Sequence, residues 1–473
     1  QLDGNKFFGE NDVHNIDATV GTEIYHDKYK TYQNVSRGYY PDRGESFVTN
    51  IDPTVYTSYA AWLSSNVPII TDNLTNTISA YASFTYAYNQ MFRINLNGRV
   101  DGSNKFGDRS NDKFLPIWSL SGSLDMKRIG LLNYKWIDYM NLKASYGFQG
   151  NMLSSESPAM TIKKGSMNTY YNSYYSTINS YPNPNLKWET TQSYNIGLDM
   201  SLFNNKLEME TSFYYKKTKN AFMTKSISSV NGIETYVING GDVTNKGYSL
   251  DVTYSPILNR NFRWTLSTSI SKIINSLDSR PDAQTYNLTD FLDGKALVKG
   301  KSVNTFYSYR FLKLSSVDGG PIFDDFQDNV SSLAGLSKYD TYTMVLQASG
   351  RRDPDIQGSL TNTFRYKNWH ANFNLAYSFG AKTRLFAMYG SAATGGVYTA
   401  DIRPDRNYSR DYLKRWKKPG DENKTNIPAI ISSASDNYTK YANHYSTRPA
   451  YADSGQPIAN SAWDMYDYSN IRV

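Results

Sequence analysis

Residues 78 to 100 form two runs in which apolar and polar side chains alternate, separated by a short turn at residues 89–91. Ala87 is the one position of the first run that breaks the alternation. The even positions carry the apolar or aromatic residues, namely Ile78, Ala80, Ala82, Phe84, Tyr86, Tyr88, Phe92, Ile94, Leu96, Gly98 and Val100. Because neighbouring side chains of a strand point to opposite faces, this pattern predicts a hairpin with one apolar and one polar face.

The same alternation recurs along the chain and predicts about twelve strands. Counting a short strand near Val473, we expect them at residues 16–24, 78–88, 92–100, 118–126, 142–149, 194–202, 207–215, 248–254, 262–270, 360–366 and 369–379. The connections alternate between short ones, near 89–91, 127–139, 203–206, 255–261 and 367–368, and long ones, near 25–77, 101–116, 149–191, 218–245, 271–356 and 380–462.

Strands of roughly 9–11 residues with short turns at one end and long loops at the other are typical of outer-membrane barrels. The chain is therefore predicted to be all-β and to form a transmembrane antiparallel β-barrel, with short periplasmic turns and long extracellular loops. A soluble all-β protein is the alternative. It would need a second sheet to bury the aromatic face, and the segments are too uniformly alternating for that.

Composition agrees with a barrel. The 473 residues have a mean hydropathy of −0.59, and no run approaches the roughly 18 apolar residues of a membrane helix. Aromatic residues make up 15% of the chain, including 41 Tyr, and Tyr and Trp favour membrane–water interfaces. The net charge of +7 is dispersed, which argues against a nucleic-acid partner and suits either a rim facing lipopolysaccharide or simple solubility.

No catalytic constellation is present, so we expect no enzymatic activity. The four histidines, His14, His26, His370 and His444, lie far apart, and the chain has no Cys. Neither metal-ligand spacing nor an HExxH motif occurs, and no G-x-S-x-G nucleophile elbow is found.

Several segments resemble motifs of one transporter family, in the family's order. They are Arg99–Gly107 (RVDGSNKFG), Leu142–Asn151 (LKASYGFQGN), Asn183–Glu189 (NPNLKWE), Asn195–Asp199 (NIGLD), Val243–Gly247 (VTNKG), Tyr377–Gly380 (YSFG), and Arg415-Trp416 followed by Asn426–Pro428 (NIP). On these segments the chain resembles the SusC-like (SusC/RagA-type) branch of the TonB-dependent outer-membrane transporters.

The resemblance implies a 22-stranded barrel, plugged by an N-terminal domain and driven through TonB. On that map residues 1–473 are one partial barrel domain, about strands 9 to 20 or the C-terminal two-thirds of the barrel. The chain starts at Gln1 without a signal peptide and stops where a strand begins. Since unpaired barrel edges are costly in lipid, we expect the plug, the TonB box and the first and last strands to lie outside it.

The resemblance also implies active import of a nutrient across the outer membrane of a Gram-negative cell, with a SusD-like surface lipoprotein as a lid. An oligosaccharide is the expected substrate. A peptide or siderophore importer, a passive porin and a surface adhesin are the alternatives. Outer-membrane lipid and lipopolysaccharide would surround the barrel, and a dimer of transporter–lid pairs is one arrangement that the resemblance allows.

Three groups of residues are candidate sites. A Tyr-rich external loop offers aromatic faces that stack on sugar rings or hold peptide side chains; its residues are Tyr170, Tyr171, Tyr174, Tyr175 and Tyr181. On the polar strand face, Arg93, Arg99 and Asp101 are expected to point into the lumen, where plug contact is favoured over substrate contact. Trp188 is expected in the outer aromatic girdle.

The third group is an acidic segment at the place where SusC-like proteins often carry an EF-hand-like stretch. Its residues are Asp318, Asp324, Asp325 and Asp328. The spacing departs from the calcium-loop pattern and Pro321 interrupts it. A solvated loop is therefore the favoured interpretation, with calcium as the alternative and no other cofactor expected.

Overall fold

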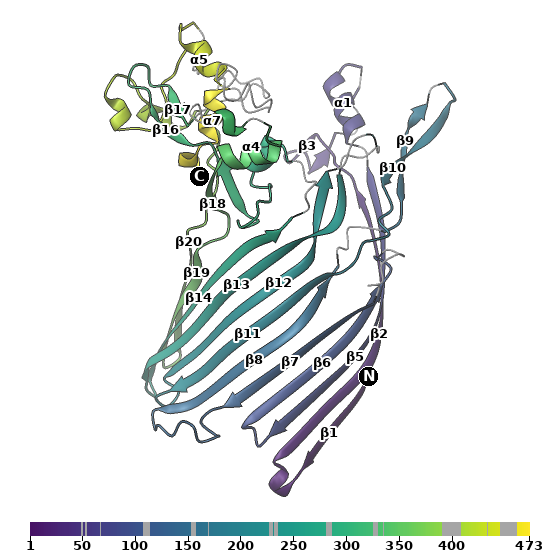
Figure 1. Cartoon of the computed structure of the whole chain (residues 1–473), viewed down its shortest axis with the longest axis vertical. Coiled ribbons are helices and arrows are strands. Elements are labelled where there is room, and N and C mark those ends of the chain that lie inside the picture. The colour runs from purple at the N-terminus through teal and green to yellow at the C-terminus, as the bar shows by residue number, and fades with distance from the viewer. Residues whose placement is uncertain are drawn as a thin grey trace.

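The computed structural model describes residues 1–48, 51–52, 54–66, 68–106, 114–152, 158–168, 170–226, 230, 235–280, 286–324, 330–333, 335–389, 408–432, 434–444 and 461–473. Within these ranges, twelve antiparallel strands form one sheet, in which each strand pairs with the next (Figure 1). In sheet order they are β1 (Leu2–Phe8), β2 (His14–Gln33), β5 (Ile69–Tyr88), β6 (Phe92–Ser103), β7 (Phe114–Asp125), β8 (Ile137–Asn151), β11 (Glu189–Leu202), β12 (Leu207–Ser226), β13 (Thr235–Leu258), β14 (Phe262–Ser279), β19 (Ile356–Tyr366) and β20 (Trp369–Phe379).

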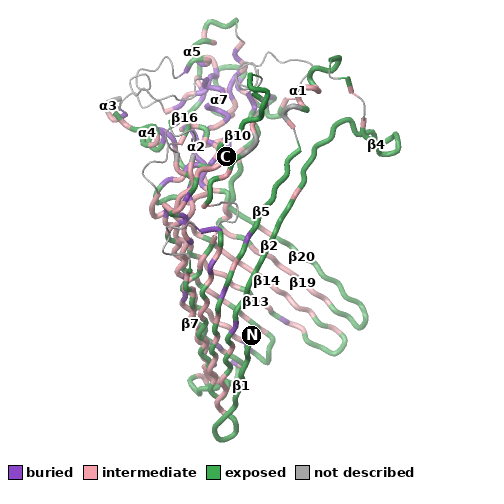
Figure 2. Tube along the Cα trace, turned by 90° about the vertical axis from the view of Figure 1, so that its right-hand side faces the viewer, coloured by how far each residue is buried: buried purple, intermediate pink, exposed green. Residues whose placement is uncertain are grey.

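The sheet is strongly curved. Figure 2 shows β7 on one side of the view, while both outer pairs, β1–β2 and β19–β20, turn toward the other side. This arrangement is a wall segment of a barrel, so the predicted fold class is confirmed. None of the described helices combines the length and hydropathy needed to cross a bilayer.

Two details of the predicted strand set are wrong. Strand β1 was not expected, because its residues are too polar to alternate; its register instead comes from pairing with β2, from Leu2 opposite Val20 to Phe8 opposite His14. The strand expected near Val473 is a short 3-10 helix, η8 (Asn470–Arg472). Its Asn470 amide donates to the carbonyl of Tyr309 at 3.1 Å, so this helix is tied to the loop between β14 and β19.

Polar side chains hydrogen-bond across neighbouring strands on one face of the sheet. Ser83 donates to Asn97 at 2.7 Å, and Asn97 donates to Ser119 at 3.3 Å, so that one row crosses β5, β6 and β7. A second row joins Thr85, Asn95 and Ser121 in the same way. These rows satisfy the polar groups of the face that the alternation assigns to the lumen.

Aromatic rings gather on the opposite face in two belts. Near the long-loop end, the ring centroid of Tyr146 lies 5.4 Å from Trp118 and 4.6 Å from Tyr194, and Tyr215 continues the row. Near the short turns, Trp136 stacks between Tyr134 and Phe203, each at 5.9 Å. Aromatic girdles at both membrane–water interfaces characterise the lipid-facing surface of a barrel.

The alternation of short and long connections is confirmed, but several loops are shorter than predicted. β2 and β5 stay paired up to Gln33 opposite Ile69, and β12 and β13 up to Ser226 opposite Thr235, because alternating strands extend beyond the apolar span. At the other end, the turn expected from residue 255 is a bulge within β13. The tight turn at residues 203–205 has positive φ throughout, which its two Asn residues tolerate.

The remaining external elements are small. The β2–β5 loop contains β3 (Tyr39–Tyr40), β4 (Ser46–Phe47) and α1 (Thr57–Ser65), and the β8–β11 loop carries the hairpin β9 (Thr161–Asn168) and β10 (Ser173–Ser180). A short 3-10 helix, η1 (Glu10–Asp12), joins β1 to β2.

The β14–β19 connection and the segment after β20, which we call the first and second loop, fold together above the sheet into one domain, the two-loop domain (the described residues within 280–355 and 381–473). Its described elements are α2 (Leu288–Leu292), β15 (Thr305–Ser308), β16 (Phe311–Leu314), β17 (Pro321–Phe323), α3 (Val330–Leu333), α4 (Lys338–Val345), β18 (Gln347–Arg351), η5 (Arg410–Lys414), η6 (Asp421–Asn423), α5 (Tyr438–Ala442), α7 (Ala462–Asp467) and η8. Figure 2 shows that most buried residues lie here rather than in the sheet. Both loops contribute to the core, in which Phe291, Tyr342 and Trp463 are almost fully buried.

Candidate functional site

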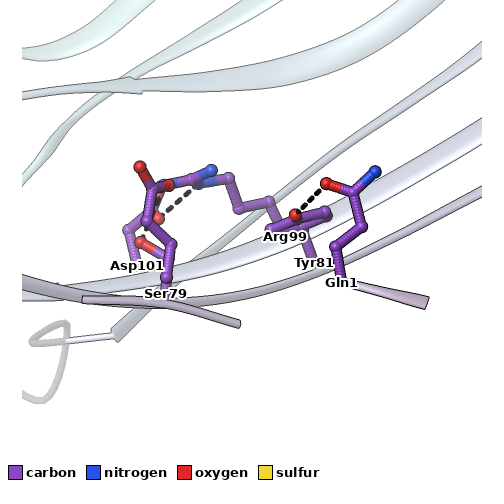
Figure 3. A network of polar contacts seen from close by, with 6 residues as sticks. Gln1, Ser79, Tyr81, Arg99 and Asp101 are labelled. Carbon is purple, nitrogen blue, oxygen red and sulfur yellow. Dashed lines mark hydrogen bonds and ion pairs between the residues drawn. The ribbon is translucent and has the colours of Figure 1, made fainter. Parts of the chain in front are cut away.

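A charged network crosses three strands on the polar face of the sheet (Figure 3). The Arg99 guanidinium on β6 donates to Asp101 at 2.6 Å, to Glu23 on β2 at 2.8 Å and to Ser79 on β5 at 2.7 Å. The strand register brings these side chains together, because Glu23 lies opposite Ser79 and Ser79 lies opposite Asp101. Two carboxylates around one guanidinium leave this part of the wall with a net negative charge.

Tyr81 extends this network towards the N-terminal edge. Its hydroxyl donates to the Gln1 side chain at 3.2 Å, as Figure 3 shows, and the Arg99 guanidinium lies 5.8 Å from the centre of its ring. The structure thus brings Arg99 and Asp101 together, as predicted for the polar face. Arg93 lies six residues from Arg99, exposed and opposite Ala87, without a place in this network. That any of the three touches a plug or substrate stays a prediction.

The tyrosines of the β9–β10 hairpin divide into a tip and a base. Tyr170 and Tyr171 lie at the turn, 86% and 73% exposed, with their ring centroids 4.9 Å apart in an edge-to-face pair. The Asn168 side chain holds the turn by accepting both of their backbone amides, at 2.9 and 3.2 Å. Tyr170 and Tyr171 therefore present two aromatic rings to solvent.

The other predicted tyrosines are placed differently. Tyr174 and Tyr175 follow one another on β10 and point to opposite faces, and the ring of Tyr175 lies over Gly165 of β9, where an added Cβ would come within 2.7 Å. Tyr181 lies half-buried where the hairpin ends. Five tyrosines close in sequence therefore do not form one surface, and ligand contact by them stays a prediction.

The acidic segment anchors the two-loop domain. Asp318 accepts hydrogen bonds from the Asn437 and Tyr441 side chains, both at 2.8 Å, and so joins the two loops. Burial alone would raise the pKa of Asp318, but these bonds and others from Ser315 and Gly320 lower it below its usual value.

The remaining acidic residues give no calcium-binding cluster that the structure describes. Asp324 lies 3.6 Å from Arg310 as an ion pair, whereas Asp325 and Asp328 lie outside the described residues. Among described residues, no three His, Asp or Glu side chains are grouped to hold a metal ion. The structure does not test the choice between a solvated loop, the favoured interpretation, and calcium binding, the alternative.

Trp188 is not in the outer aromatic girdle, so that prediction is wrong. Its side chain is 7% exposed and stacks on Phe106, with ring centroids 4.3 Å apart. Phe106, which follows β6, covers the indole, and the local sequence did not indicate this contact. The outer girdle is formed instead by strand residues such as Trp118 and Tyr146.

A half-buried arginine and a buried aspartate stabilise the two-loop domain. Arg384, from the second loop, donates to the carbonyls of Leu292 and Tyr307 in the first, at 2.9 and 2.8 Å. Asp467 accepts the backbone amides of Met388 and Tyr389 at 2.7 and 2.9 Å. Burial raises the pKa of Asp467 to about 7, although these bonds and Arg472 act to lower it.

The wall geometry can be compared with known proteins. The family model described as "TonB dependent receptor-like, beta-barrel" matches residues 2–311. The chain belongs to the TonB-dependent receptor β-barrel family. Among curated relatives, TonB-dependent receptor P3 of Formosa agariphila is 25% identical over 434 residues, which cover 84% of this chain and 40% of the relative. TonB-dependent receptor SusC of Bacteroides thetaiotaomicron is 24% identical over 321 residues, covering 64% of this chain and 31% of the relative.

Solved structures agree with this family. The RagAB peptide transporter superposes with a TM-score of 0.69 at 19% identity, covering 91% of this chain and 46% of that chain. The present chain therefore spans less than half the length of the TonB-dependent receptors it matches. The predicted SusC-like type and the outer-membrane location of the family are confirmed, while the assignment to strands 9 to 20 stays a prediction.

In this TonB-dependent receptor, the NPNLKWE motif fastens a loop to the rim. The Asn183 side chain donates to the Val237 carbonyl of β13 at 2.6 Å. The Asn239 side chain accepts the Lys187 amide at 3.0 Å and donates to the Lys187 carbonyl at 2.8 Å. The motif thus fixes the base of the loop that carries the tyrosine hairpin, a role that its sequence alone did not reveal.

Proposed function

We propose that the protein is an active importer of an oligosaccharide across the outer membrane, energised through TonB and closed by a SusD-like lipoprotein lid. Membership of the TonB-dependent receptor family supports the transport class. The hairpin tip supports an oligosaccharide as the substrate, because Tyr170 and Tyr171 expose two rings that lie edge to face. Flat apolar faces with polar edges suit the faces of sugar rings.

A peptide is the second candidate substrate. The RagAB neighbour is a peptide transporter, and its importer has been solved in "closed-closed" and "open-open" states. A lid that opens and closes suits either substrate class. The charged wall around Arg99 supports the peptide alternative, because it offers both a cation and carboxylates to a zwitterionic ligand.

Uptake by cells separates these candidates. Cells lacking the gene, complemented with the full-length protein, would be given labelled oligosaccharides or labelled peptides, with and without TonB. We expect oligosaccharide accumulation that requires TonB. Accumulation of peptide alone would make the protein a peptide importer, and uptake that persists without TonB would make it a passive pore.

The double variant Tyr170→Ala/Tyr171→Ala tests the hairpin. A ring contact contributes roughly 0.5–1.5 kcal/mol beyond area burial, so losing both should weaken oligosaccharide binding about tenfold, at about 1.4 kcal/mol per factor of ten. Binding is measured by calorimetry on the full-length protein. Tyr134→Ala is the matched control, because Tyr134 is also exposed but belongs to a short-turn connection. Unchanged affinity in the double variant would remove the tip from the binding site.

A further inference from the structure

Three lysines stand on neighbouring strands of the apolar face, just beyond its outer aromatic belt. Lys217 on β12 lies two residues past Tyr215, Lys246 on β13 lies two residues before Tyr248, and Lys272 on β14 lies two residues past Ile270. In each strand this step leads away from the short turns, towards the long-loop end. Each lysine is thus the first charged position of the lipid-facing row outside the apolar span.

The register places the three side chains next to one another. Lys246 lies directly opposite Tyr215, whereas Lys217 lies opposite Thr244, so Lys217 and Lys246 are diagonal neighbours. Lys272 lies opposite Tyr248, which makes it the diagonal neighbour of Lys246. Diagonal pairs across a sheet are about 7–8 Å apart, within reach of long side chains.

The diagonal follows the plane of the membrane. Lys246 lies two residues nearer the short-turn end of its strand than Thr244, the residue opposite Lys217. Lys272 likewise lies two residues nearer that end than Ile274, the residue opposite Lys246. The strands of the sheet are inclined, as Figure 1 shows, and barrel strands tilt by about 35–45°. In a tilted sheet, residues directly opposite one another on successive strands lie at different heights in the membrane. The shift of two residues per strand offsets this difference, so the three ammonium groups lie at about the same height.

The cluster carries an excess of positive charge. Asp278 is the one carboxylate in ion-pair contact with it among described residues; it lies 3.7 Å from Lys217 and also accepts a bond from Thr244. Lys246 and Lys272 form no ion pair or side-chain hydrogen bond with any residue that the structure describes. Below them the same face exposes Phe213, Tyr215 and Tyr254.

A cationic row above an aromatic and apolar surface fits an anionic amphiphile. Lysine ammonium groups bind phosphate as point charges, and basic residues beside a bilayer attract anionic headgroups. We propose that Lys217, Lys246 and Lys272 bind the phosphate of a phosphorylated glycolipid in the outer leaflet, whose acyl chains cover the apolar face below. The site is independent of the imported substrate and stands whatever that substrate proves to be.

Native mass spectrometry of the full-length protein in mild detergent tests this site, with bisphosphorylated lipid A as the probe and chemically dephosphorylated lipid A as the comparison. The triple variant Lys217→Gln/Lys246→Gln/Lys272→Gln should bind lipid A at least tenfold more weakly than the wild type. The wild type should bind the dephosphorylated lipid as weakly as the variant binds lipid A. Heat-shift electrophoresis verifies that each barrel is folded.

The matched control is Lys135→Gln/Lys206→Gln/Arg260→Gln, which removes three charges from the short-turn connections and should leave lipid A affinity unchanged. Equal binding of lipid A by wild type and triple variant would overturn the proposal. So would equal binding of the two lipids by the wild type, or an equal loss in the control variant. Failure of oligosaccharide uptake would not affect any of these outcomes.

Discussion

At the scale of single residues, the face on which a side chain lies decides the consequence of changing it. Leu96 and Asn97 are neighbours on β6 with opposite orientations. Leu96 is half-exposed on the apolar face, whereas Asn97 joins the polar row between Ser83 and Ser119. One side chain contacts hydrocarbon and the other contacts polar groups.

We expect Leu96→Arg to lower the free energy of unfolding by about 2–4 kcal/mol, since a charge at mid-depth on a lipid face costs that much. Asn97→Arg should cost about 1 kcal/mol, the worth of an ordinary hydrogen bond. Denaturant titration of the barrel in lipid vesicles measures both. Equal losses would contradict the assignment of the two faces.

At the scale of strands, three glycines are covered by a tyrosine ring from the neighbouring strand. The cross-strand pairs are Gly21 with Tyr81, Gly247 with Tyr214 and Gly358 with Tyr377. An added Cβ at each would lie within 3 Å of that tyrosine. Aromatic cover of this kind compensates for the missing side chain, and these glycines are required by close packing rather than by a turn.

Gly358→Ala should therefore destabilise the barrel by about 1–3 kcal/mol, the usual cost of overpacking. Its Cβ would clash with the Ser269 carbonyl oxygen of β14. Gly98→Ala is the matched control, because no atom lies within 4 Å of the Cβ position in that strand glycine. Unfolding midpoints that shift equally for both variants would rule out packing as the reason for Gly358.

At the scale of the whole molecule, two loops far apart in sequence share one core above the barrel wall. Arg384 joins the two loops by donating to backbone carbonyls of the first. Asp467 joins two distant parts of the second loop by accepting the backbone amides of Met388 and Tyr389. An extracellular surface built in this way is a preformed domain rather than a set of separate loops.

The stability of the two-loop domain should depend on pH through Asp467. Its folded pKa of about 7 lies above the ordinary value of 3.8, so between these values the folded domain binds a proton that the unfolded chain does not. This contribution is fully present below pH 3.8 and is lost as pH rises through 7. We expect the domain to melt at a lower temperature at pH 8 than at pH 6.

Tryptophan fluorescence follows this transition, because two of the eight tryptophans, Trp416 and Trp463, are buried in the two-loop domain. The variant Asp467→Asn, which cannot titrate, provides the reference at each pH. The difference in melting temperature between wild type and variant should change from pH 6 to pH 8. A difference that stays constant across this range would exclude Asp467 as the titrating group.

Sequence patterns predicted the local features of the wall well. Eleven of the strands follow from alternation, and the polar orientation of Arg99 and Asp101 follows from parity. They did not reveal that Arg99 meets Glu23, because the register across the β2–β5 loop is not encoded locally. The basic row of Lys217, Lys246 and Lys272 was missed for the same reason, since only the register shows that the three are neighbours.

The alternation alone determined that each span of this chain has two faces meeting different surroundings, since the period of a strand is a property of neighbouring residues. The tertiary structure decided that the described parts of the two loops share one core and that Trp188 is buried under Phe106. These contacts join residues about 80 or more positions apart. Their formation depends on which apolar surfaces the strand ends bring together, and no local pattern records that choice.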